Sequence, residues 1–174
     1  MRCLIVYSST EGQTEKIARA LAERCRSQGH EAETREVSAA EPDLSSYDRV
    51  IVGGSIHINK HQRALTRFVR ERRDDLNRHQ GTAFFSVSLS ASGDEKDRAA
   101  ARGLMKAFLE RQEWRPRWQA IFAGAVRWKK YGFFKRFLIR QIIKRKDPRA
   151  DLSGDLEYTD WAEVDRFADE VMGD

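Results

Sequence analysis

Close to its N-terminus the chain reads Cys3-Leu4-Ile5-Val6-Tyr7-Ser8-Ser9-Thr10-Glu11-Gly12-Gln13-Thr14. The run from Cys3 to Tyr7 is typical of a buried β-strand, and the residues after it form a hydroxyl-rich turn. A helix is predicted directly after the turn, because apolar residues recur at steps of three and four: Ile17, Ala18, Leu21, Ala22 and Cys25. A turn between a strand and a helix can bind phosphate, since the first N–H groups of the helix lack partners and its dipole favours an anion.

The turn itself supplies suitable ligands for such an anion. Hydroxyl groups come from Ser9, Thr10 and Thr14, and Gly12 allows the backbone to approach a ligand closely. We therefore predict a phosphate-bearing cofactor. The candidate residues are Ser9, Thr10, Glu11, Gly12, Gln13 and Thr14.

Length and composition indicate one soluble globular domain, residues 1–174. The chain has 174 residues, of which 40% are hydrophobic and 34% charged. Its longest apolar run, Ala120 to Val126, is far too short to span a membrane, and we expect no signal peptide because the first strand begins at once. Cys3 and Cys25 are interpreted as buried thiols in a reducing cytosol, and no Cys/His spacing suggests a metal site.

The net charge of +5 is unevenly distributed along the chain. Between Arg127 and Arg149 there are ten cations and one acid, Asp147, which gives this segment +9. The rest of the chain has 22 cations and 26 acids, a net charge of −4. Residues 127–149, here called the basic insertion, therefore need an explanation of their own.

Strand and helix signals alternate along the whole chain. Strands are predicted at 3–7, 31–37, 48–54, 82–88 and 119–126. Helices are predicted after Thr14, at 61–76, at 97–112, and from Asp160, which can cap the last helix with Glu163 as its capping-box partner. Such alternation predicts an α/β sandwich of three layers, a five-stranded parallel sheet with helices on both faces. The basic insertion falls between the fifth strand and the last helix.

Three strand ends carry small or hydroxyl residues that suit a flat cofactor, namely 8–14, 53–57 and 86–90. Ligands of parallel sheets bind at the carboxyl ends of the strands, near the point where the strand order reverses. We therefore expect these three segments to meet at one site.

The turn Ser9-Thr10-Glu11-Gly12-Gln13-Thr14 resembles the phosphate loop of the flavodoxin-like family, with Glu11 where that family usually has Thr. The resemblance implies a sheet order of 2-1-3-4-5 and FMN as cofactor. It also implies that the loops 53–58 and 86–93 flank the isoalloxazine. Further candidate FMN residues are Gly54, Ser55, Ile56, Ser86, Val87, Ser88, Leu89, Ser90 and Gly93.

A closer resemblance covers almost the whole chain and is to the bacterial menaquinone-dependent protoporphyrinogen IX dehydrogenases, flavodoxin-like enzymes of haem biosynthesis. It is carried by Gly12-Gln13-Thr14, Tyr47-Asp48-Arg49-Val50, Gly54-Ser55-Ile56, Phe85-Ser86-Val87, Trp114-Arg115-Pro116, Ala123-Gly124-Ala125 and Tyr158-Thr159-Asp160-Trp161. That family also has a basic, aromatic insertion before its last helix. The resemblance implies oxidation of protoporphyrinogen IX to protoporphyrin IX, with electrons passing through FMN to menaquinone or ubiquinone.

No residue is a convincing general base, and the weak catalytic candidates are His57, Lys60 and His61. One of them could stabilise charge on reduced flavin or relay protons. The plainer interpretation, which we favour, is a solvated loop and helix start. Neither flavin loop contains Trp or Tyr, so at least one ring face could be open to substrate and quinone.

The basic insertion has three interpretations. It could bind the inner face of the cell membrane from the cytoplasm, because large apolar residues accompany its cations. Its cations could instead pair with the propionates of the porphyrinogen, or the segment could pack in a homo-oligomer. The candidate contact residues are Arg127, Lys129, Lys130, Phe133, Phe134, Arg136, Phe137, Arg140 and Lys144.

Other functions compete with the dehydrogenase hypothesis. A general FMN-dependent NAD(P)H:quinone reductase remains an alternative, since small reductases of this fold often lack a second Gly-rich motif. A flavodoxin-type electron carrier fits the basic insertion less well, because such carriers normally present an acidic face. The Phe and aliphatic content of the insertion fits lipid better than nucleic acid, so no nucleic acid partner is expected.

Overall fold

The computed structural model describes residues 1–39, 42–126 and 155–173. The basic insertion, 127–149, lies outside the described residues.

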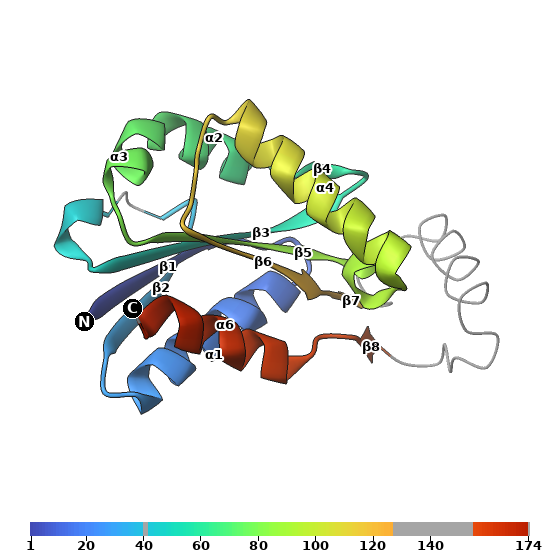
Figure 1. Cartoon of the computed structure of the whole chain (residues 1–174), viewed down its shortest axis with the longest axis horizontal. Helices are drawn as coiled ribbons and strands as arrows, with labels where there is room; N and C mark the ends of the chain where they lie inside the picture. The colour runs from blue at the N-terminus through green and yellow to red at the C-terminus, as the bar shows by residue number, and fades with distance from the viewer. Residues whose placement is uncertain (40–41, 127–154, 174) are drawn as a thin grey trace.

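Five parallel strands form the central layer of the described structure, in the order β2-β1-β3-β5-β6 (Figure 1). They are β1 (Arg2–Ser8), β2 (Glu31–Glu36), β3 (Arg49–His57), β5 (Thr82–Ser88) and β6 (Trp118–Ala123). If the short antiparallel strand β4 is left out of the numbering, β5 and β6 become the fourth and fifth strands. The order is then the predicted 2-1-3-4-5. The order reverses between β1 and β3, so the carboxyl ends of these two strands are where a ligand is expected.

Helices cover both faces of the sheet (Figure 1). On one side lie α1 (Gln13–Ser27) and α6 (Trp161–Met172), and on the other lie α2 (Arg63–Glu71), α3 (Arg73–Arg78) and α4 (Glu95–Arg111). Successive β1 side chains enter different cores, Cys3 and Ile5 toward α1, Leu4 and Val6 toward α2. The predicted three-layer sandwich is confirmed.

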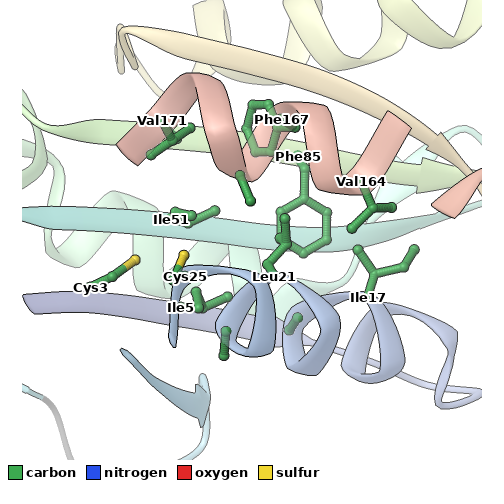
Figure 2. Packing of buried hydrophobic residues seen from close by; sticks show 14 of the residues in the cluster. Cys3, Ile5, Ile17, Leu21, Cys25, Ile51, Phe85, Val164, Phe167 and Val171 are labelled. Carbon is green, nitrogen blue, oxygen red and sulfur yellow. The ribbon is translucent and has the colours of Figure 1, made fainter. Parts of the chain in front are cut away.

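The core beneath α1 and α6 holds in place α1, which begins within residues 9–14, here called the phosphate turn. Ile17, Leu21 and Phe85 pack together there, as Figure 2 shows. Cys3 and Cys25 belong to the same core, where both are buried free thiols, as predicted.

The segment after Gly53-Gly54 differs from its predicted form. We expected the strand to end in these glycines, but β3 continues to His57 and pairs antiparallel with β4 (Lys60–His61). Ile58 and Asn59 form the connection with positive φ angles of 49° and 60°, the conformation of a two-residue hairpin turn. The loop predicted at 53–58 is therefore a β-hairpin.

The helix predicted at 61–76 is two helices, and its start was also wrong. His61 lies in β4, α2 begins at Arg63, and the helical path is interrupted at Arg72, whose φ is −107°. The Arg72 guanidinium donates to the carbonyl of Pro42 at 3.2 Å. This contact between segments distant in the sequence accompanies the break, and helical periodicity carries no sign of it.

Smaller differences occur near the C-terminus. The strand predicted at 119–126 is divided at Gly124 into β6 and β7 (Ala125–Val126), and β7 pairs antiparallel with β8 (Leu156–Glu157). Asp160 caps α6 as predicted by accepting from the N–H of Ala162 at 2.9 Å. The N–H of Glu163 also donates to the Asp160 carboxylate, at 3.3 Å, as a capping box requires. The Glu163 carboxylate accepts from Arg98 at 3.0 Å instead of returning to the N–H of Asp160.

Two short 3-10 helices, η1 (Leu44–Ser46) and η2 (Leu89–Ser92), complete the described elements. Among the described residues, no helix combines the length and apolar character that crossing a membrane requires.

Candidate functional site

The turn between β1 and α1 has the geometry of an anion cradle. Gly12 adopts the left-handed conformation, with φ of 97°, at the position before α1. Its N–H donates to the hydroxyl of Ser9 at 3.0 Å, which closes the turn. Within the described structure no side chain caps the helix at this position, and the N–H groups of its first turn suit an anion. Thr14 is buried at the start of this helix.

Gln62 joins the phosphate turn to the β3–β4 hairpin. Its amide Nε2 donates to the Thr10 hydroxyl at 3.1 Å and to the Ser55 hydroxyl at 2.7 Å. Ser55 in turn shares a hydrogen bond of 3.1 Å with His57 Nε2. Gln62 was missed in the sequence because it carries no motif. Its one signal is its position between a hairpin and a helix.

The same amide provides a test of whether FMN fits here. Within the described structure, Gln62 Oε1 is buried and has no hydrogen-bond partner. A buried acceptor without a donor is costly, and a ligand with O–H or N–H groups would satisfy it. The phosphate of FMN suits the helix N–H groups and hydroxyls of the turn, and its ribityl hydroxyls and ring N–H suit the orphaned oxygen. The residues present therefore fit FMN.

The end of β5 forms the third side of the site. Ser86 and Val87 are buried, while Ser88, Leu89 and Ser90 are partly exposed. Ser88 accepts from the N–H of Ala91 at 3.3 Å and thereby caps η2. Its carbonyl accepts from Gly124 at 3.1 Å, which fixes the end of β6 beside it.

Gly93 lies at the end of this loop, where close packing leaves no room for a side chain. A Cβ at this position would collide with the carboxylate of Asp97 in the first turn of α4. Of the remaining candidates, Gly54 and Ile56 lie within β3 rather than in a loop.

The three weak catalytic candidates occupy different environments. His57 is partly buried beside Ser55, Lys60 is exposed, and His61 is only 9% exposed. His61 Nε2 shares a hydrogen bond of 2.9 Å with the Ser86 hydroxyl, and its ring packs 4.4 Å from that of Phe108. The interpretation as a solvated loop is wrong for His61. Burial lowers the pKa of His61 to about 4, so the imidazole is neutral at pH 7.

The segment that follows the basic insertion also reaches the phosphate turn. Gln13 donates to the hydroxyl of Thr159 at 2.9 Å, and Lys16 forms an ion pair of 2.7 Å with Glu157. Thr159 in turn donates to the carbonyl of Ala123 at 2.7 Å, at the end of β6. The start of α1 is therefore held by residues far away in the sequence. The candidate contact residues of the insertion, Arg127 to Lys144, lie outside the described residues.

Comparison with known proteins agrees with this geometry. A flavodoxin-domain family model matches residues 4–153. The chain is 36% identical over 172 residues to protoporphyrinogen IX dehydrogenase [quinone] of Escherichia coli K12, covering 98% of this chain and 94% of that protein. A relative of the same name in Leishmania major is 33% identical and covers 96% of this chain and 73% of that protein.

Solved structures show the same fold at low identity. A flavodoxin from the domain Archaea matches with a TM-score of 0.56 at 14% identity, covering 99% of this chain and 97% of that one. A flavodoxin of Streptococcus pneumoniae TIGR4 matches with a TM-score of 0.55 at 17% identity, covering 99% of both chains. The chain belongs to the flavodoxin-domain family, in the group that contains the quinone-dependent protoporphyrinogen IX dehydrogenases.

Proposed function

We propose that this protein is an FMN-dependent oxidoreductase of haem biosynthesis that oxidises protoporphyrinogen IX to protoporphyrin IX and passes the electrons to a quinone. The observation that carries the proposal is the 36% identity to a dehydrogenase of that name along 98% of the chain. The FMN-compatible site at the carboxyl ends of β1, β3 and β5 supports it independently.

FMN, when bound, supplies the redox chemistry, and the chain supplies binding and orientation. The N–H groups at the start of α1 and the hydroxyls of Ser9, Thr10 and Thr14 hold the phosphate. Gln62 positions the phosphate turn against the hairpin through Thr10 and Ser55. His61 is kept neutral by burial and fixes the hydroxyl of Ser86. His57, hydrogen-bonded to Ser55, is the remaining candidate for holding a proton at this site.

The composition of the flavin loops supports an enzyme with two reaction partners. Residues 53–58 and 86–93 contain neither Trp nor Tyr, so the chain offers no aromatic cover from these loops. Instead the hairpin tip places Ile58 in solvent, with 97% of its surface exposed. An uncovered flavin face suits successive access by porphyrinogen and quinone.

Anaerobic mixing tests the proposed reaction. FMN-loaded protein should produce porphyrin fluorescence from protoporphyrinogen IX when menaquinone or ubiquinone analogues are present, and hardly any when the flavin or the quinone is withheld. Comparison of the two analogues identifies the preferred acceptor. Absence of fluorescence growth, with flavin reduction by NADH or NADPH instead, would contradict the proposal and indicate a general quinone reductase.

We further propose that the basic insertion, 127–149, binds the cytoplasmic face of the membrane, where the quinone is dissolved. Its net charge of +9 and its apolar residues support this. Each cation near an anionic surface contributes about 1 kcal/mol, so Arg136→Gln/Arg140→Gln/Lys144→Gln should weaken binding to phosphatidylglycerol-containing vesicles by about 100-fold in co-sedimentation.

A control variant removes the same charge elsewhere. Lys96→Gln/Lys106→Gln/Arg166→Gln neutralises three exposed cations of α4 and α6, and its vesicle binding should change much less. Equal effects of the two variants would show that net charge alone, and not the insertion, governs the binding.

A further inference from the structure

A cationic groove lies beside the candidate flavin site, on the α2 and α4 side of the sheet. It has a volume of about 480 Å³ and is lined by the β3–β4 hairpin, α2 and the C-terminal half of α4. This volume is within the range of small-molecule sites, about 300–1,000 Å³. Leu104, Ala107 and Phe108 provide its apolar lining.

Positive charge dominates the rest of the groove lining. Lys60, Arg63, Arg67, Arg70 and Arg111 all line it and all are exposed, and no Asp or Glu does so in the described structure. Arg67 pairs with Glu71 at 2.8 Å. Arg63, Arg70 and Arg111 have no ion pair with any described residue.

The sequence places these cations together by helical spacing. Arg63, Arg67 and Arg70 are separated by four and three residues, so they share one face of α2. Arg111 comes from the end of α4, across the groove. Like charges gathered around a hollow repel one another and create a field that attracts an anion. An apolar lining with a guanidinium rim therefore selects an amphipathic anion.

We propose that this groove binds the tetrapyrrole through its propionates, with carboxylates on Arg63, Arg70 and Arg111 and the ring system against Leu104 and Phe108. The inference rests on the proposed function, which supplies a largely apolar macrocycle with two carboxylates. Guanidinium groups bind carboxylates with paired hydrogen bonds and shed water more readily than ammonium groups do. Arginine-rich composition thus suits this ligand.

The groove and the flavin loops share one wall. His61 lines the groove, and its Nε2 is hydrogen-bonded to Ser86, a candidate flavin residue, at 2.9 Å. The next residue, Gln62, contacts the phosphate turn through Thr10. A ligand in the groove therefore lies against the same hairpin that borders the flavin site.

A larger cavity along another face of the same half of α4 is a weaker candidate for this ligand. Its volume is about 1,020 Å³, and it is lined by acids, Glu110 and Glu113, as well as by Arg102, Lys106 and Arg115. None of the candidate flavin residues lines it. These three cations provide a matched control.

Fluorescence titration of FMN-loaded protein with protoporphyrin IX, the stable product, tests the groove. Arg63→Gln/Arg70→Gln/Arg111→Gln should raise the Kd about 10-fold, which corresponds to about 1.4 kcal/mol, because the variant loses the paired guanidinium–carboxylate hydrogen bonds. Arg102→Gln/Lys106→Gln/Arg115→Gln should change it less than about 2-fold. Protoporphyrin IX dimethyl ester, presented in the same mild detergent, should bind the wild type and the groove variant equally weakly.

An unchanged Kd for protoporphyrin IX in the groove variant would overturn the inference. If that variant also lost binding to phosphatidylglycerol vesicles, the groove would be assigned to lipid headgroups instead.

Steady-state kinetics separates this inference from the proposed function. If wild type does not oxidise protoporphyrinogen IX, the proposed function fails. If wild type is active and the groove variant keeps its KM, the groove assignment alone fails. The expected result is an active wild type, with KM raised about 10-fold in the groove variant and kcat within about 2-fold.

Discussion

The Gly12→Val/Thr14→Val variant is expected to purify without colour, with FMN affinity reduced at least about 100-fold. Gly12 has φ of 97°, and a β-branched residue there is strained by about 1–2 kcal/mol or moves the turn. Loss of the Thr14 hydroxyl removes a hydrogen bond to a charged phosphate, worth about 1.5–3 kcal/mol. Together these amount to about 2.5–5 kcal/mol, a range whose lower end is close to the roughly 2.8 kcal/mol that corresponds to 100-fold. Absorbance of the purified protein and titration of apoprotein with FMN measure the effect.

General destabilisation must be separated from loss of the phosphate site. Gly29 also has a positive φ, of 83°, but it lies just beyond the other end of α1, where an added Cβ would meet no atom within 4 Å. Gly29→Val/Thr34→Val therefore imposes a comparable backbone strain and removes a hydroxyl on β2. This control should unfold more easily and still bind flavin. Full flavin occupancy in the Gly12→Val/Thr14→Val protein would disprove the assignment of the phosphate turn.

The sheet and its order could be predicted because buried parallel strands leave a strong local signal. β1 contains a continuous apolar run from Cys3 to Tyr7, and β5 is rich in Phe and Val, since both faces of each strand are covered. The helices between them repeat apolar residues at helical spacing. Once the strands alternate with helices, the handedness of the crossovers leaves few arrangements. The position of the turn between β1 and α1 was equally predictable, because its residues are contiguous.

Gly53 shows what local signals miss. From the sequence it belonged to a segment suited to wrapping a cofactor. In the structure it lies inside β3, directly opposite Phe85 of β5, and a Cβ there would collide with the Phe85 ring. The glycine makes room for the aromatic ring, and this reason depends on a strand register that one sequence does not reveal.

The cationic groove between α2 and α4 could not be predicted from the sequence, because it too depends on tertiary packing. Arg63 and Arg70 are ordinary surface residues of an amphipathic helix until α4 brings Arg111 opposite them. The sequence drew attention to the basic insertion because its ten cations fall within one segment, 127–149. Charges gathered by tertiary packing leave no such run.

His61 is expected to make the protein about 2 kcal/mol less stable at pH 5 than at pH 7. Burial lowers its pKa to about 4 from an ordinary value of 6.5. The unfolded chain therefore binds a proton between these values while the folded chain does not. The contribution of neutral His61 to folding stability is fully present above pH 6.5 and is lost as the pH falls toward 4. The total loss is about 3 kcal/mol. Urea unfolding of wild type and His61→Gln at both pH values isolates this contribution.

A second variant tests whether burial or the hydrogen bond to Ser86 lowers the pKa of His61. Ser86→Ala removes the hydroxyl 2.9 Å from His61 Nε2 but leaves the ring between Phe84 and Phe108. Because desolvation lowers this pKa, Ser86→Ala should keep the pH dependence, whereas His61→Gln should lose it. His79, whose pKa burial also lowers, is present in all three proteins and cancels in the comparison. Equal pH dependence in wild type and His61→Gln would show that His61 is not held neutral, and the wall between groove and flavin site would then carry a charge.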